Sequence, residues 1–124
     1  MSKESAPTQN LIKGKFFEEQ ALAFLLARGL VLIERNFHCR RGEIDLIMLH
    51  NHDMVFVEVR YRRNGRFGGA ALSIDGKKQQ KIRLAAQSWL QQNESLTFRG
   101  CRFDVIAIEG DKQNLQTQWI SDAF

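Results

Sequence analysis

The segment Gly42–Arg62, GEIDLIMLHNHDMVFVEVRYR, constrains the fold of this chain more than any other part of the sequence. Two runs rich in apolar residues, typical of strands, flank the polar tetrapeptide HNHD. A hairpin that turns at the centre of this tetrapeptide places Asp45 opposite Glu58 and Glu43 opposite Arg60. The sequence therefore predicts a hairpin with two carboxylates inside it.

The two faces of the predicted hairpin differ in polarity, because side chains alternate along a strand. One face is wholly apolar and carries Ile44, Leu46, Met48, Val55, Val57 and Val59. The other face carries Glu43, Asp45, Ile47, Phe56, Glu58 and Arg60. This second face is apolar near the turn and ionic at the far end. We therefore expect a sheet that is covered on both sides, with a charged pocket at one end.

The repulsion between the two opposed acids, Asp45 and Glu58, must be compensated. Directly opposed side chains on a hairpin have Cβ atoms about 4.5–5.5 Å apart, and two buried carboxylates at that separation repel each other. A raised pKa on one acid, an ion pair with Arg60 or a bound divalent cation would each relieve the repulsion. The residues alone leave these alternatives open, but all of them make the two acids parts of one site.

The rest of the chain predicts further helices and strands by the same periodicities. These are a helix over residues 13–29, a strand over 30–37, a helix over 77–91, a strand over 101–109 and a short edge strand over 116–120. Gly29 is expected to stop the first helix, and Asp75 is expected to cap the second. The inward face of the second helix is expected to carry Ile82, Ala85, Ala86, Trp89 and Leu90.

The element order predicts the fold class. An α-β-β-β-α-β order with a last edge strand is typical of a mixed α/β domain, in which helices cover a central sheet. The chain has 124 residues, a length that suits one domain. We expect that domain to span residues 11–124, and we expect residues 1–10 to form a disordered tail.

Charge and composition restrict the class of partner and the compartment. The formal net charge of +4 favours anionic partners, and basic residues cluster at residues 40–41, 60–66 and 77–83. Such clusters are often only solvated surface, but three of them around one acidic site favour phosphate binding. No apolar run approaches the ~18–20 residues of a membrane span. The polar N-terminus lacks a signal-peptide apolar region, so we expect a cytoplasmic protein.

The two cysteines, Cys39 and Cys101, do not indicate a disulfide framework. They lie far apart in the sequence, and neither belongs to a CxxC motif. The FHCR stretch at residues 37–40 contains a histidine and a cysteine, but no second pair has the spacing of a zinc site. We therefore expect two reduced thiols and no zinc.

The hairpin motif resembles the PD-(D/E)xK nuclease superfamily, because an acid, twelve residues and then Glu-x-basic lie on adjacent strands after a glutamate-bearing helix. GEIDLI followed by VFVEVRYR, with GKFFEEQALAFLLARGL upstream and RFDVIAI and WISDAF downstream, is similar to the bacterial YraN family. That family resembles archaeal Holliday-junction resolvases in fold. Over about residues 11–124, the resemblance implies a restriction-endonuclease-like domain. It also implies a Mg²⁺- or Mn²⁺-dependent endonuclease acting on branched or structured DNA.

The resemblance also implies roles for individual residues. Asp45 and Glu58 match the metal-binding acids, and the backbone carbonyl of Val59 would complete the protein ligands. Glu18 matches the additional acid of resolvase-like members, although a glutamate beside Glu19 can also be a solvated helix residue. The expected contacts to DNA phosphates come from Arg40, Arg41, Arg62, Arg63, Arg66, Lys77 and Lys78.

Arg60 departs from the superfamily pattern, because it occupies the position of the motif's lysine. Arginine stays protonated and cannot serve as a general base. We expect Arg60 to orient the attacking water or to stabilise charge that develops on phosphorus.

Two other functions fit the same residues. A nucleic-acid-binding module that kept the nuclease fold without efficient chemistry would be consistent with Arg60. A protein-interaction domain would use the buried acids as an ion-pair network. A resolvase that acts on a four-way junction usually needs two-fold symmetry, which favours a homodimer.

Overall fold

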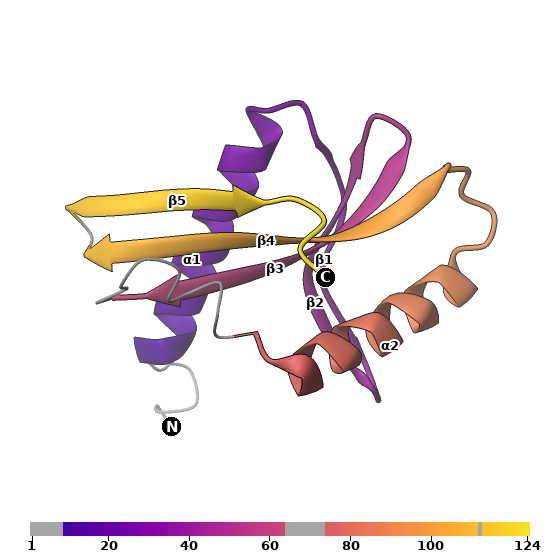
Figure 1. Ribbon diagram of the computed structural model, residues 1–124, viewed down its shortest axis with the longest axis horizontal. Coiled ribbons are helices and arrows are strands. Elements are labelled where there is room, and N and C mark those ends of the chain that lie inside the picture. The colour runs from indigo at the N-terminus through magenta and orange to yellow at the C-terminus, as the bar shows by residue number, and fades with distance from the viewer. Residues whose placement is uncertain (1–8, 64–73, 112) are drawn as a thin grey trace, which may run out of the picture.

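The computed structural model describes residues 9–63, 74–111 and 113–124, with side chains from residue 14 onward. These described residues form two helices and five strands, which are labelled in Figure 1. In chain order the elements are α1 Gln9–Leu26, β1 Val31–Cys39, β2 Gly42–His50, β3 Asp53–Arg62, α2 Gly76–Gln92, β4 Gly100–Asp111 and β5 Asn114–Ile120. The predicted order is confirmed, including the last edge strand. Neither helix, over the part of the chain described, is long and apolar enough to cross a membrane.

The strands form one mixed sheet in the order β1-β2-β3-β4-β5 (Figure 1). The β3–β4 pair is parallel, and the other neighbouring strands are antiparallel. A parallel pair requires a long crossover connection, and α2 lies in that connection. The mixed central sheet of an α/β domain with a restriction-endonuclease-like core is therefore confirmed.

The two helices cover opposite faces of the sheet, because alternate residues of the central strands pack in two different clusters. The α1-side cluster comprises Phe17, Ala21, Leu22, Leu25, Leu30, Leu46, Met48, Val55, Val57, Ile106 and Ile108. The α2-side cluster comprises Phe37, Ile44, Ile47, Met54, Phe56, Ile74, Ile82, Ala85, Ala86, Trp89, Val105 and Ala107. The expected coverage of both faces is confirmed, and it leaves the central strands buried.

The predicted helix signals act as expected. Gly29 has a φ of +93°, a conformation that favours glycine, and it ends the turn of residues 27–29 that follows the last residue of α1, Leu26. The side chain of Asp75 accepts a hydrogen bond of 2.9 Å from the backbone N–H of Lys78, which caps α2. Residues 1–8 of the expected tail lie outside the described residues, whereas Gln9 and Asn10 belong to α1.

The prediction that Ile44 shares a face with Leu46 and Met48 is wrong. Ile44 packs in the α2-side cluster, whereas the other two side chains pack under α1. The start of β2 lies directly against α2, since a Cβ atom added to Gly42 would be 2.9 Å from the carbonyl oxygen of Lys81. This contact draws the first residues of β2 toward α2, and the regular alternation of side chains ends there.

A buried acid, Asp104, ties the last strands together. Its side chain is 0% exposed. It accepts hydrogen bonds from Arg102 Nε at 3.0 Å, from Trp119 Nε1 at 2.9 Å and from the backbone N–H of Asp122 at 2.9 Å. Because these donors come from β4, β5 and the C-terminal segment, one carboxylate fixes three parts of the chain.

We predict that Asp104→Ala lowers the free energy of unfolding by about 3–5 kcal/mol, because it leaves the half-buried Arg102 without its main partner. Asp53→Ala is the matched control, since Asp53 also pairs with Arg102, at 3.8 Å, but its side chain is 44% exposed. The control should cost less than about 1 kcal/mol. Urea denaturation of both variants tests this, and equal losses would contradict the role of Asp104.

Candidate functional site

The site forms where β2 and β3 separate. Their ladder runs from His50–Asp53 to Leu46–Val57, which confirms the predicted hairpin register. Beyond this point, β2 remains paired with β1 as far as Gly42, and β3 remains paired with β4 as far as Arg62. The divergence opens a gap between two strands that are neighbours in the sheet.

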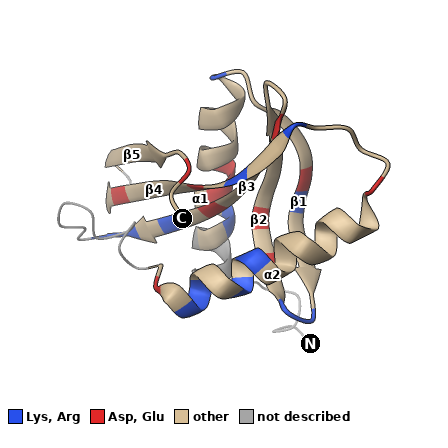
Figure 2. Cartoon of the chain, turned by 45° about the vertical axis from the view of Figure 1, so that its right-hand side comes forward, with Lys and Arg blue, Asp and Glu red and all other residues tan. Residues whose placement is uncertain are grey.

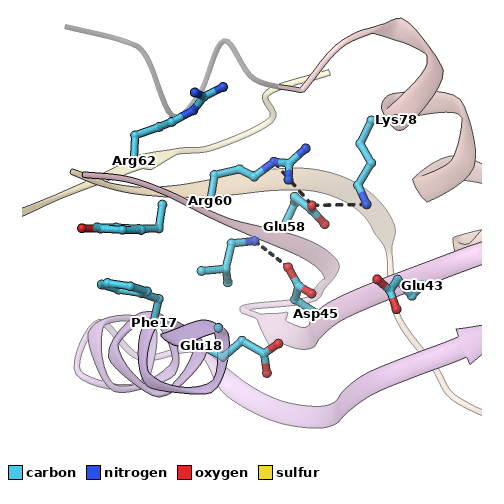
Figure 3. Close-up of a pocket in the computed structure, with 11 residues that line it drawn as sticks. Phe17, Glu18, Glu43, Asp45, Glu58, Arg60, Arg62 and Lys78 are labelled. Carbon is cyan, nitrogen blue, oxygen red and sulfur yellow. Dashed lines mark hydrogen bonds and ion pairs between the residues drawn. The ribbon is translucent and has the colours of Figure 1, made fainter. Parts of the chain in front are cut away.

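The side chain of Asp45 lies at the start of this gap. The backbone N–H of Val59 donates a hydrogen bond of 2.8 Å to Asp45 Oδ2, so a carboxylate takes the place of a strand backbone acceptor (Figure 3). The N–H and C=O groups of one strand residue point to the same edge. The carbonyl oxygen of Val59 therefore also lies on the edge that faces the gap.

The gap is a pocket of about 620 Å³. Its lining consists of Gly14, Phe17, Glu18, Glu43, Asp45, Glu58, Val59, Arg60, Tyr61, Arg62 and Lys78. Among these described residues, four are acids and three are bases. We call this cavity the acidic pocket. It brings together all four predicted catalytic residues and Val59, which come from α1, β2 and β3.

Glu58 is the centre of the charge network in the acidic pocket. It is 5% exposed. Arg60 Nε and Lys78 Nζ each lie 3.7 Å from the same oxygen, Glu58 Oε2 (Figure 3). Lys78 reaches this oxygen from α2, so two cations from different elements meet one acid. These separations indicate ion pairs rather than short hydrogen bonds.

Burial and, after it, the charge of Asp45 raise the pKa of Glu58 to about 8, against the opposing effects of Lys78 and Arg60. Burial also raises the pKa of Asp45, although the Val59 N–H favours its charged form. A hydrogen bond between the two carboxyl groups favours the anion on Asp45 and the proton on Glu58. Burial and mutual repulsion therefore favour a proton shared by the two acids, held on Glu58, over two adjacent negative charges.

Glu18 faces the same pocket from α1 (Figure 3). Burial raises its pKa, and the charge of Asp45 adds to the effect. For these three acids, burial outweighs the stabilisation that the surrounding cations give to the charged forms. A bound divalent cation would favour the anionic forms of all three.

The described part of the chain holds no ready-made cage of three His, Cys, Asp or Glu side chains for a metal ion. Mg²⁺ does not require such a cage, because it keeps several waters and is commonly held by one or two carboxylates. Asp45 and Glu58 meet that requirement.

The six predicted phosphate-binding residues that the structure describes fall into three groups. Arg62 and Lys78 line the acidic pocket, and Arg40 and Arg41 line a neighbouring one. Lys77 and Arg63 are exposed and line neither of these two pockets. Arg66 lies outside the described residues, as does most of the glycine-rich loop. Binding of nucleic acid by these side chains stays a prediction.

Sequence reasoning missed several features of the pocket. Glu43 lies against His38 of β1, at 3.0 Å between Oε1 and Nδ1, and not against Arg60, because β2 stays with β1 beyond the ladder. Phe17 and Tyr61 stack with ring centroids 3.8 Å apart and form an aromatic wall that no motif indicated.

We predict that Glu58→Gln makes the protein less sensitive to rising pH. A carboxyl whose folded pKa lies above its unfolded value gives full stability below about pH 4.5 and loses it progressively until about pH 8. Glutamine removes this loss, so the variant should be more stable than wild type at pH 8 by a few kcal/mol, roughly. Denaturation at pH 5 and at pH 8 measures the difference.

The matched control for this prediction is Glu94→Gln, at an exposed position, which should follow the wild-type pH profile. Strong destabilisation by Glu58→Gln at both pH values would contradict the prediction. It would show instead that Glu58 is a structural ion-pair partner of Arg60 and Lys78.

The family model and the similar proteins that we found all belong to one family. The model of a family described as "Uncharacterised protein family UPF0102" matches residues 17–108. A UPF0102 protein of Nitrosococcus oceani is 48% identical over 118 residues, 95% of each chain. A relative from Pseudomonas savastanoi pv. phaseolicola is 52% identical over 90% of this chain and 91% of its own. Another, from Hahella chejuensis, is 50% identical over 95% of this chain and 97% of its own. The chain belongs to the UPF0102 family, which is the YraN family.

Proposed function

We propose that this chain is a metal-dependent endonuclease that hydrolyses phosphodiester bonds of DNA, with branched or otherwise structured DNA as its substrate. The observation that carries the proposal is the pair of acids, Asp45 and Glu58, at the point where two strands separate, with Arg60 and Lys78 against them. Carboxylates that can hold a cation beside fixed positive charges suit hydrolysis of a phosphodiester.

The donor set of the acidic pocket fits Mg²⁺ or Mn²⁺, which prefer oxygen ligands. Asp45, Glu58 and the backbone carbonyl of Val59 would hold the ion. When bound, the ion would polarise the scissile phosphate and acidify a water molecule. Burial raises the pKa of both acids, and a bound divalent cation would offset that cost of holding two charges in the pocket.

Lys78 supplies the lysine amine that is missing from the motif, because Arg60 occupies the motif's lysine position. Arg60 carries a permanent charge, and we assign to it the stabilisation of negative charge on the phosphate. Lys78 approaches Glu58 Oε2 at the same distance from the other side. We assign to Lys78 the contact with the attacking water, which the motif's lysine would otherwise make. Glu18 would accept a hydrogen bond from a water of the same pocket.

Basic side chains around the acidic pocket support binding of the DNA backbone. Figure 2 shows lysine and arginine at the end of β3, at the start of α2 and at the turn between β1 and β2. The described residues in these places are Arg40, Arg41, Arg60, Arg62, Arg63, Lys77, Lys78 and Lys81. Phosphate contacts position a nucleic acid without reading its sequence, and they make affinity depend on salt.

A second candidate function is a nucleic-acid-binding module without efficient chemistry. Arg60 in the position of the motif's lysine favours it. This function would require the basic side chains but not the anionic form of Asp45, so a variant at that residue separates the two.

We predict that Asp45→Asn abolishes cutting but not DNA binding. The asparagine side chain can still accept the hydrogen bond from Val59, so the fold should persist while the cation loses a charged ligand. Labelled duplex, flap, single-stranded and four-way-junction DNA, incubated with Mg²⁺, Mn²⁺ or EDTA, should be cut by wild type only, and only with metal. Native and denaturing gels from the same tubes record binding and cutting.

Two results would contradict the nuclease assignment. Cuts that persist in Asp45→Asn would come from a contaminant. Equal band shifts without cuts in both proteins would favour the binding module. As an independent readout, Mg²⁺ should raise the melting temperature of wild type at pH 8 but not that of Asp45→Asn.

We predict that Lys78→Met lowers kcat by about 10²–10³-fold, the scale expected when a charged group at the reacting centre is removed. Lys77→Met is the control, because Lys77 precedes Lys78 on α2 and is exposed outside the acidic pocket. It should change KM and salt dependence alone. Steady-state kinetics on the preferred substrate measure both, and equal kcat values in the two variants would exclude the role of Lys78.

A further inference from the structure

A second cavity, of about 380 Å³, adjoins the acidic pocket. Its lining consists of His38, Cys39, Arg40, Arg41, Gly42, Glu43, Lys78 and Lys81. Among these described residues, four side chains are cationic and one, Glu43, is an acid. We call this cavity the basic pocket. Glu43 and Lys78 line both pockets, so the two cavities share one wall.

The basic pocket is held in shape by a close contact between the β1–β2 turn and α2. A Cβ atom on Gly42 would lie 2.9 Å from the carbonyl oxygen and 3.4 Å from the carbonyl carbon of Lys81. Only a glycine allows this approach without a shift of backbone. The contact therefore holds Arg40 and Arg41 of the turn beside the lysines of the helix.

The charge of the basic pocket comes from its side chains. The N-terminus of α2 is capped by Asp75, which already accepts from the backbone N–H of Lys78. Glu43 pairs with His38 at 3.0 Å, and this contact partly offsets its negative charge when the histidine is protonated. The remaining cations have the positive excess that attracts a phosphate.

We propose that the basic pocket binds a backbone phosphate of a nucleic-acid strand, adjacent to the phosphate that lies at the acidic pocket. Arginine side chains bind phosphate oxygens through paired N–H groups, and two of them meet two lysines here. The assignment of the neighbouring phosphate to the acidic pocket rests on the function proposed above. The binding of a phosphate in the basic pocket does not depend on that function.

This arrangement gives Lys78 a position between two successive phosphates and gives the strand a path from the β1–β2 turn toward β3. Lys81, which the sequence placed in a basic cluster but not among the individual phosphate-binding residues, becomes a phosphate-binding residue. Among the described residues, the lining of the basic pocket contains no Phe, Tyr or Trp on which a base would stack and no Asn or Gln to read a base edge. The expected recognition is therefore independent of base sequence.

The test is an NMR titration of the full chain, labelled with ¹⁵N, in EDTA so that no metal acts. A short single-stranded oligothymidylate should perturb the backbone signals of residues 38–43 and 78–81. Arg41→Met and Lys81→Met should each weaken binding by about 3- to 10-fold and lower the slope of log K against log salt by about 1. Inorganic phosphate should perturb the same signals at much higher concentration, because it supplies one phosphate without a strand.

Two further variants separate geometry from charge. Gly42→Ala keeps every charge but pushes the turn from α2, so it should weaken oligothymidylate binding while circular dichroism and melting report whether the fold persists. Arg99→Met removes one exposed positive charge at the opposite end of β3, where Gly100 pairs with Asp53. It should leave binding within about twofold.

The outcomes distinguish the failure of this inference from the failure of the nuclease assignment. Equal affinities of Arg41→Met, Lys81→Met and Arg99→Met would overturn the phosphate site, even if wild type cuts DNA. Perturbations confined to residues 58–63 would also overturn it. Loss of binding in the pocket variants, together with absence of cutting in wild type, would support the phosphate site and reject only the nuclease.

Discussion

The hydrogen bond from the Val59 N–H to Asp45 is the interaction on which the site depends. A strand that leaves its neighbour exposes backbone donors, and a buried donor without a partner costs free energy. Here a carboxylate supplies the acceptor at 2.8 Å, and a charged acceptor makes such a bond stronger. The same bond completes the edge of β3 and fixes the direction of the acid, so β2 and β3 can separate and leave a pocket in the sheet.

The separation of β2 and β3 places two pockets of opposite electrostatic potential next to each other. The acidic pocket concentrates carboxylates, whose pKa values are raised, and the basic pocket concentrates arginine and lysine. α2 supplies Lys78 to both cavities. A divalent cation would reduce the repulsion among the carboxylates of the acidic pocket, and a polyanion would reduce the repulsion among the cations of the basic pocket. Because the pockets adjoin, binding of the cation is expected to favour binding of the polyanion.

Local periodicity made the hairpin and its acids predictable. The turn centred in HNHD gave the register, and the alternation of side chains gave the buried Ile47 and Phe56 and the position of Asp45 and Glu58 at the ionic end. Ile44 and Glu43 escaped prediction because the docking of α2 on β2 and the divergence of the strands are long-range effects. The reach of Lys78 to Glu58 depends on the same docking. The buried position of Asp104 could have been predicted from the sequence. It is an acid inside the apolar strand RFDVIAI, and the same signal identified Asp45 and Glu58.

The parallel pairing of β3 with β4 also determines which contacts of the site can form first during folding. The β2–β3 hairpin is local in sequence, whereas β4 can join β3 only after the crossover that contains α2 has closed. A partly synthesised chain can therefore form the hairpin with its two acids before α2 is docked. Lys78 reaches them only when the long-range contacts are complete, so the full set of charges arises together with the native fold and not before it.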